Sequence, residues 1–170
     1  MSVMSPAMAW HLAQLNVARL RAPLDDPLIA DFVDNLERVN ALGEHSPGYV
    51  WRLQTDEGDA TAVRAFDDPL VILNLTVWTS VEALAEFAYR SGHVEFLRRK
   101  REWFERAVDA HLVMWWVPAG HRPTVEEALD RLEDLRSNGA SARAFTFRSP
   151  QAPPGADDGP VVDERNACPA

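Results

Sequence analysis

The sequence predicts an α+β fold of the ferredoxin-like type, in which a split β-α-β unit builds one antiparallel sheet. Strand-like and helical patterns succeed each other in the order strand, helix, strand, strand, helix, strand. Residues 70–79 form a strand that is largely apolar on both faces, so its sheet is expected to be covered on both sides. A chain of 170 residues is long enough for one domain around one core.

The N-terminal half supplies the first strand, the first helix and the second strand. Residues 10–17 alternate as a strand. Asp25 or Asp26 is expected to cap a helix with Pro27 at its first position and Gly43 at its end. Residues 49–55 predict the second strand, and the polar residues 56–68 predict a flexible connection to the central strand at 70–79.

A second helix follows the central strand. It is expected to begin at Ser80, to bend or break at Ser91 and Gly92, and to continue to Phe104. Residues 111–117 then predict the fourth strand of the sheet.

A helix and a short strand follow as a C-terminal appendix. Thr124 and Glu127 have the spacing of a capping box, and Gly139 ends the helix that they begin. Residues 144–148 predict a fifth strand at a sheet edge. We therefore divide the chain into a flexible N-terminus (1–8), one domain (9–148) and a disordered, Pro/Gly-rich tail (149–170).

Composition excludes several classes of partner. The chain has 17 basic and 26 acidic residues and a net charge of −9, which argues against nucleic acid and anionic membranes. No apolar segment approaches 18 residues, and the first residues lack a signal-peptide pattern. The single cysteine, Cys168, cannot form an internal disulfide. These observations predict a soluble cytoplasmic protein.

Asn74 and Trp78 share one face of the central strand and are candidates for one pocket. A buried amide without a partner costs about 1–3 kcal/mol, so Asn74 needs a hydrogen bond from protein, water or ligand. The pocket interpretation gives the amide to a ligand and makes Trp78 an aromatic wall. In the alternative, backbone groups satisfy Asn74 and Trp78 is a core residue.

His93 and the basic cluster at residues 98–101 are candidates for acid–base chemistry and anion binding. His93 is either a packed helix residue or a pocket acid or base that titrates near neutrality. Helical geometry lets one or two of the cluster point inward, with Arg98 or Arg101 the candidates; otherwise the cluster is a solvated face. The five histidines lack zinc-site spacing, so no metal is expected.

Three stretches resemble the domain-of-unknown-function family 3291, and the resemblance covers residues 9–148. They are LTVWTSVEALAEF (75–87), SGHVEFLRRKREWF (91–104) and residues 103–147 from WFERAV to ARAFTF. That family belongs to the dimeric α/β barrel superfamily, alongside the antibiotic biosynthesis monooxygenases. The resemblance implies a dimeric α/β barrel. The doubly apolar central strand and the adjacent Trp115 and Trp116 likewise predict a face-to-face homodimer.

The resemblance also implies a cofactor-independent, monooxygenase-like enzyme acting on a small hydrophobic or aromatic metabolite. In such enzymes an Asn four residues before a Trp, and an Arg on the next helix, line the cavity, and Asn74, Trp78 and Arg98 match them. Leu84 stands where these enzymes have Tyr. In the heme-degrading branch an Asn, a Trp and a His hold the heme. Asn16 could match that Asn, but Phe87 replaces the Trp and the His position falls near Leu97 or Arg98, so heme is disfavoured and we expect no cofactor.

The expected roles follow from that resemblance. Asn74 donates to an oxyanion or peroxide, Arg98 stabilises the deprotonated substrate, and His93 moves the proton. Trp78 stacks on the substrate. Trp115 and Phe87 are also assigned to substrate binding. The alternatives are a non-catalytic ligand-binding or dimerisation module, and a lyase or isomerase that uses the same cavity.

Overall fold

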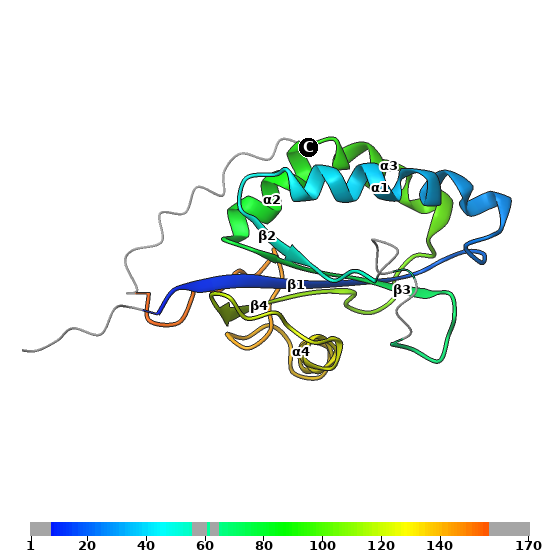
Figure 1. Ribbon diagram of the computed structural model, residues 1–170. Coiled ribbons are helices and arrows are strands. Elements are labelled where there is room, and N and C mark those ends of the chain that lie inside the picture. The colour runs from blue at the N-terminus through cyan, green and yellow to red at the C-terminus, as the bar shows by residue number, and fades with distance from the viewer. Residues whose placement is uncertain (1–7, 56–60, 62–64, 157–170) are drawn as a thin grey trace, which may run out of the picture.

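A four-stranded antiparallel sheet forms the centre of the computed structural model, which describes residues 8–55, 61 and 65–156 (Figure 1). The strands are β1 (Trp10–Arg19), β2 (Tyr49–Arg52), β3 (Val71–Trp78) and β4 (Leu112–Pro118), and their order is β2-β3-β1-β4. Every neighbouring pair is antiparallel. This order, with β1 and β3 at the centre, confirms the predicted ferredoxin-like fold.

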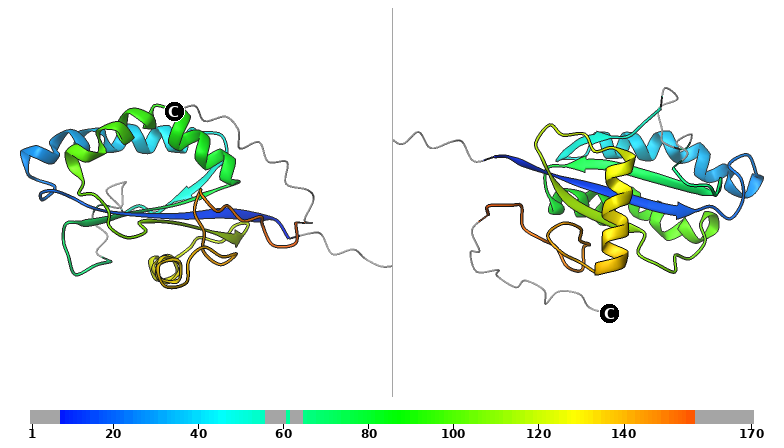
Figure 2. Two further views of the ribbon diagram at one scale, coloured as in Figure 1. Left: turned by 180° about the vertical axis from the view of Figure 1, so that it is seen from behind. Right: turned by 90° about the horizontal axis from the view of Figure 1, so that it is seen from below.

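Helices cover both faces of this sheet. A short 3-10 helix (Pro27–Ile29) leads into α1 (Ala30–Glu44), which lies with α2 (Val81–Arg90) and α3 (His93–Trp103) over one face. The fourth helix, α4 (Val125–Asn138), crosses the other face (Figure 2). We call these the helix-layer face and the α4 face.

Local sequence signals set the helix ends. Asp26 accepts a hydrogen bond from the Leu28 N–H at 2.8 Å, and Thr124 accepts one from the Glu127 N–H at 3.1 Å, as the capping patterns predict. Gly139 follows α4 at a φ of 77°, a conformation that favours glycine. Gly43 does not end the first helix as expected, because α1 continues to Glu44.

The predicted break between α2 and α3 is confirmed. Ser91 has an extended backbone and ends α2. Its Oγ donates to the Phe87 carbonyl and accepts from the His93 N–H at 3.1 Å. The hydroxyl thus satisfies backbone groups on both sides of the break.

The α4 face is buried within the chain, which corrects the reasoning for a face-to-face dimer. Leu75 and Val113 on the sheet are fully buried, as is Ala128 on α4, and Leu132 of α4 is 2% exposed. The doubly apolar central strand is therefore covered by the appendix helix on one side and by the helix layer on the other. The homodimer stays a prediction, but this face no longer provides the reason for it.

The termini differ from the predicted boundaries. Residues 144–148 add only one bridge to the β4 edge, where Phe145 and Met114 exchange backbone hydrogen bonds of 2.8 and 2.9 Å. Residues 149–156 of the predicted disordered tail are placed in the structure, and the Gln151 carbonyl accepts a 2.8 Å hydrogen bond from the Trp116 indole. Residues 1–7 and 157–170, with Cys168, lie outside the described residues, as do 56–60 and 62–64 of the predicted flexible connection.

Two apolar clusters hold the helix layer on the sheet. One contains Trp78 and Leu84, with Phe87 packed against it. The other contains Phe32 and Trp103, with Phe96 and other half-buried residues around it. Polar side chains lie between them on the sheet.

Candidate functional site

Four polar side chains form a strip on the helix-layer face of the two central strands. Gln14 lies opposite Thr76, and Asn16 lies opposite Asn74, in the register of β1 and β3. Residues two apart on a strand share a face, so all four point to the side on which Trp78 packs. We call this set the polar strip.

Solvent reaches the polar strip at its two asparagines. Asn74 is exposed although it lies within a central strand beneath the helix layer, and Asn16 is half-buried. Among the described residues neither side-chain amide has a hydrogen-bond partner, and neither amide is among the buried polar atoms that lack one. The predicted satisfaction of Asn74 by backbone is not found, so both amides are free to bind a ligand or water.

Trp78 forms an end wall of the site. It is 1% exposed, stacks on Phe87 at 5.2 Å between ring centroids, and meets Tyr49 edge-on at 5.6 Å. Its indole N–H donates to Thr76 Oγ1 at 2.9 Å, and that hydroxyl donates to Gln14 Oε1 at 2.9 Å. Trp78 therefore packs against and orients Gln14 and Thr76, the buried half of the strip. The prediction was that a substrate stacks on the Trp78 ring, but Phe87 covers the ring.

His93 links the two clusters from the helix layer. Its ring lies 4.8 Å from Phe87 and 6.3 Å from Phe96 between centroids. Its Nδ1 lies 3.3 Å from the Ala88 carbonyl, which requires a proton on Nδ1. Burial lowers the pKa of His93, and the Ala88 carbonyl offsets part of that effect. The lowered pKa favours the neutral ring, in which Nε2 is a proton acceptor.

None of the expected arginines enters the site, which corrects the role given to Arg98. Arg98 and Arg101 are both exposed on α3. Arg99 binds Asp31 at 2.7 Å and Glu102 at 2.8 Å, with its guanidinium 4.8 Å from the Trp103 ring centroid. The inward side of α3 is taken by Phe96 and Trp103, so the basic cluster forms the solvated face that the sequence offered as the alternative.

Trp115 is also not a substrate-binding residue of this site. It is 1% exposed on the α4 face, on the opposite side of the sheet from the polar strip. Its indole donates to Glu127 Oε1 at 3.0 Å, and Glu127 Oε2 lies 2.7 Å from His121 Nε2. Adjacent strand residues face opposite ways, and it is Trp116 that lies on the helix-layer face.

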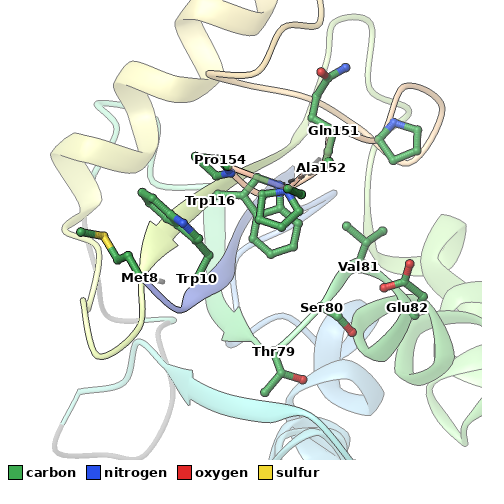
Figure 3. Close-up of a pocket in the computed structure, with 14 residues that line it drawn as sticks. Met8, Trp10, Thr79, Ser80, Val81, Glu82, Trp116, Gln151, Ala152 and Pro154 are labelled. Carbon is green, nitrogen blue, oxygen red and sulfur yellow. Dashed lines mark hydrogen bonds between the residues drawn. The ribbon is translucent and has the colours of Figure 1, made fainter. Parts of the chain in front are cut away.

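A separate cavity of about 1030 Å³ opens at the end of the sheet, and no predicted site residue lines it. Trp10 and Trp116 form one side, residues 150–156 lie over them, and the start of α2 at Ser80 and Val81 lies across from them (Figure 3). We call it the tryptophan cavity. Asn74, Trp78 and Arg98, which were expected to share one cavity, do not line this one.

Sequence reasoning missed Gln14 and considered Asn16 only as a match to the Asn of the heme-degrading branch. Alternation along residues 10–17 puts both on one face of their strand. Their placement beside Asn74 and Thr76 depends on the register between β1 and β3, which a single strand pattern does not contain.

The site offers proton transfer and anion stabilisation at a polar floor beneath aromatic side chains. Neutral His93 can accept a proton, and the amides of Asn16 and Asn74 can donate to an oxygen. Among the described residues no group of three His, Cys, Asp or Glu side chains is placed to hold a metal ion. Nor does any helix in that part of the chain have the length and apolarity needed to cross a bilayer.

Comparison with known families and structures gives the following matches. The sequence profile of a domain of unknown function, DUF3291, matches residues 11–160. No protein with a curated description matches at a significant level.

Three solved structures are among the matches, each with a TM-score below 0.5. SnoaB, a cofactor-independent oxygenase from Streptomyces nogalater, is 18% identical with a TM-score of 0.45 and covers 69% of this chain and 98% of its own. A candidate antibiotic biosynthesis monooxygenase from Nitrosomonas europaea is 10% identical with a TM-score of 0.44, and the match covers 71% of this chain and 100% of the Nitrosomonas chain. A candidate antibiotic biosynthesis monooxygenase from Chloroflexus aurantiacus J-10-fl is 16% identical with a TM-score of 0.38, and the match covers 68% of this chain and 98% of the Chloroflexus chain.

Proposed function

This chain belongs to the DUF3291 family, and from that premise we propose that it is an enzyme acting on a small hydrophobic or aromatic metabolite. The observation that supports this most is the pair of facing amides, Asn16 and Asn74, which lack partners among the described residues and are open to solvent within a central sheet. A folding role gives no reason for two free amides at that position. A ligand oxygen gives one.

The proposed reaction begins with proton transfer to His93. The Nε2 atom takes a proton from an acidic C–H or O–H of the bound metabolite, while Nδ1–H stays on the Ala88 carbonyl. Charge then develops on the metabolite's oxygen, where the amides of Asn16 and Asn74 donate to it. Phe87 and Phe96 flank His93 and provide the apolar surface for the ring or chain.

In the monooxygenase-like form of this proposal, dioxygen is the second substrate and no cofactor takes part. A deprotonated CH₂ group is oxidised to a carbonyl, one oxygen atom enters the product and the other leaves as water. Two expected groups are missing from the site, since Arg98 is exposed and Leu84 stands at the position of the Tyr. That difference favours a second candidate, an isomerase or lyase that uses the same proton transfer without oxygen.

Binding is tested with a matched pair of variants. Asn74→Ala removes an amide of the polar strip, and Asn138→Ala removes one at the C-terminal end of α4, on the far face of the sheet. Calorimetric titration with 1-naphthol should show at least tenfold weaker binding to Asn74→Ala and unchanged binding to Asn138→Ala. Because the Asn74 side chain is exposed and unpaired, the melting temperature of Asn74→Ala should differ from that of the wild type by no more than about 2 °C. Equal affinity in both variants, with Asn74→Ala destabilised, would overturn the site.

Turnover is tested by oxygen uptake. Native mass spectrometry of the purified chain identifies any metabolite that it carries, and that metabolite is supplied with and without dioxygen. Oxygen uptake that fails in His93→Gln supports the monooxygenase-like reaction. Conversion that proceeds without oxygen, and fails in the same variant, supports the isomerase or lyase. A wild-type chain that binds the metabolite unchanged under both conditions is a binding module.

A further inference from the structure

Gln14 is a buried polar side chain that the proposed reaction does not use. It is 4% exposed and lies on β1 between Leu12 and Asn16 along the same face. Its carbonyl oxygen, Oε1, accepts the hydrogen bond from Thr76. The amide has a second polar end, the amino group, and its surroundings determine what that end can bind.

A hydrogen-bond relay determines which way the Gln14 amide faces. The Trp78 indole N–H can only donate, so Thr76 Oγ1 accepts from it at 2.9 Å. Thr76 is itself buried, and among the described residues Gln14 and Trp78 are the hydrogen-bond partners of its hydroxyl. If the amide turned over, both neighbours would donate to Thr76 and the hydroxyl proton would be left unpaired. The relay therefore holds Oε1 toward Thr76.

The amino group of Gln14 consequently points away from the Thr76 hydroxyl and is available to bind another group. It has no hydrogen-bond partner among the described residues. Among those residues the buried polar side-chain atoms without a partner are His11 Nδ1 and Arg131 Nε, so the Gln14 amino group keeps contact with solvent. The neighbouring open positions on the strip are Asn16 and Asn74, which lie next to the Gln14–Thr76 pair in the β1–β3 register. The two asparagine amides can rotate to donate or accept, whereas the Gln14 amide is fixed as a donor.

We propose that Gln14 is a specificity-determining residue whose fixed amino group selects metabolites that present a carbonyl oxygen, or the corresponding enolate, to the sheet. This inference rests on the proposed function, because it assigns the substrate class of the same site. A hydroxyl group is a poorer match, since it can accept from Gln14 only by directing its own proton elsewhere. His93, whose Nε2 accepts, lies in the helix layer that covers the face of the polar strip, so the selected compound is a carbonyl compound with an acidic proton near that carbonyl.

The test uses two probes that differ by one carbonyl oxygen, 1-tetralone and tetralin, with affinities measured by calorimetry or ligand-observed NMR. Wild-type protein should bind 1-tetralone about tenfold more tightly than tetralin, the range expected for one well-placed hydrogen bond. Gln14→Met keeps the side-chain length and removes the amino donor, so the ratio should fall to about one.

Two variants at Thr76 separate orientation from general structural damage. Thr76→Ser keeps the hydroxyl and should keep the tenfold ratio. Thr76→Val removes the group that holds Oε1, so the Gln14 amide can turn over and the ratio should fall below about threefold. Melting curves establish that each variant is folded, and the Thr76 pair decides the question if Gln14→Met does not fold.

The outcomes distinguish this inference from the proposed function. Tenfold discrimination that persists in both Gln14→Met and Thr76→Val overturns the role of Gln14, while weaker binding by Asn74→Ala leaves the site in place. Wild-type protein that binds both probes equally overturns the substrate class alone. If 1-tetralone does not bind, this inference fails and the 1-naphthol titration still decides the site. If 1-tetralone and 1-naphthol both bind Asn74→Ala as tightly as wild type, the proposed site and this inference both fail.

Discussion

Leu132→Ala should destabilise the fold strongly, because Leu132 carries much of the contact between α4 and the sheet. The side chain is 2% exposed and belongs to the core that includes Leu75, Val113 and Ala128. Truncating a buried Leu to Ala costs about 2–5 kcal/mol through lost transfer energy and the cavity left behind. For a chain of this size each kcal/mol lowers the melting temperature by about 2–4 °C, so we expect a fall of about 4–20 °C.

The assay is thermal unfolding followed by circular dichroism, with Glu133→Ala as the control. Glu133 is the next residue of α4 and is exposed, so its removal should cost less than about 0.5 kcal/mol. Sedimentation at micromolar concentration is measured on the same samples. A loss below about 1 kcal/mol in Leu132→Ala would refute the packing of α4 on this face. A dimer that dissociates in Leu132→Ala, with the control unaffected, would return that face to its predicted role as an interface.

Three further predictions follow from pKa shifts and one hydrogen bond. Burial lowers the pKa of His93 below its ordinary value of 6.5, so on acidification the unfolded chain takes up a proton before the folded chain does. The free energy of unfolding should therefore fall as the pH drops below about 6.5. In urea melts at about pH 7.5 and about pH 5.5, His93→Gln should lose less stability between the two pH values than the wild type does. Burial raises the pKa of Glu127, but hydrogen bonds from His121 and Trp115 outweigh it, and the net pKa is below 4.5. That contribution is present above pH 4.5 and lost as the pH falls below it, so Glu127→Gln should lose less stability there, and equal loss would contradict the assignment. Trp116→Phe removes the donor to the Gln151 carbonyl, which should cost about 0.5–1.5 kcal/mol and speed hydrogen exchange in residues 150–156, whereas Trp10→Phe should leave that exchange unchanged.

The sequence was sufficient for the order of elements because each element carries a local signal. Alternation identified the strands, and Thr124 and Gly139 identified both ends of α4. The location of α4 could not be read in the same way. Its apolar stripe requires an apolar surface, but the stripe does not say whether this surface is a partner subunit or the second face of its own sheet. The structure places it on the sheet, where Leu75 and Val113 are buried beneath it.

The site was partly predictable for the same reason. Asn74 stood out because it interrupts an apolar strand, and it is the exposed residue of the polar strip. The substrate-binding role of Arg98 was assigned from the resemblance of the chain to other enzymes. The rotation of α3 turns Arg98 outward, while Phe96 and Trp103 face the core. Gln14 required the β1–β3 register and the Trp78–Thr76 relay, which only the three-dimensional arrangement provides.

The access of solvent and ligand to Asn74 beneath the helix layer is tested most directly by thiol labelling. Asn74→Cys and the buried control Thr76→Cys are each made in a Cys168→Ser background and exposed to a small thiol reagent under native conditions. We expect the thiol at position 74 to react quickly and to be protected by 1-tetralone at a saturating concentration, raised to offset the binding lost with the Asn74 amide. The thiol at 76 should react only after unfolding. Equally slow reaction at both positions, or labelling at 74 that 1-tetralone does not change, would contradict a ligand site at the polar strip.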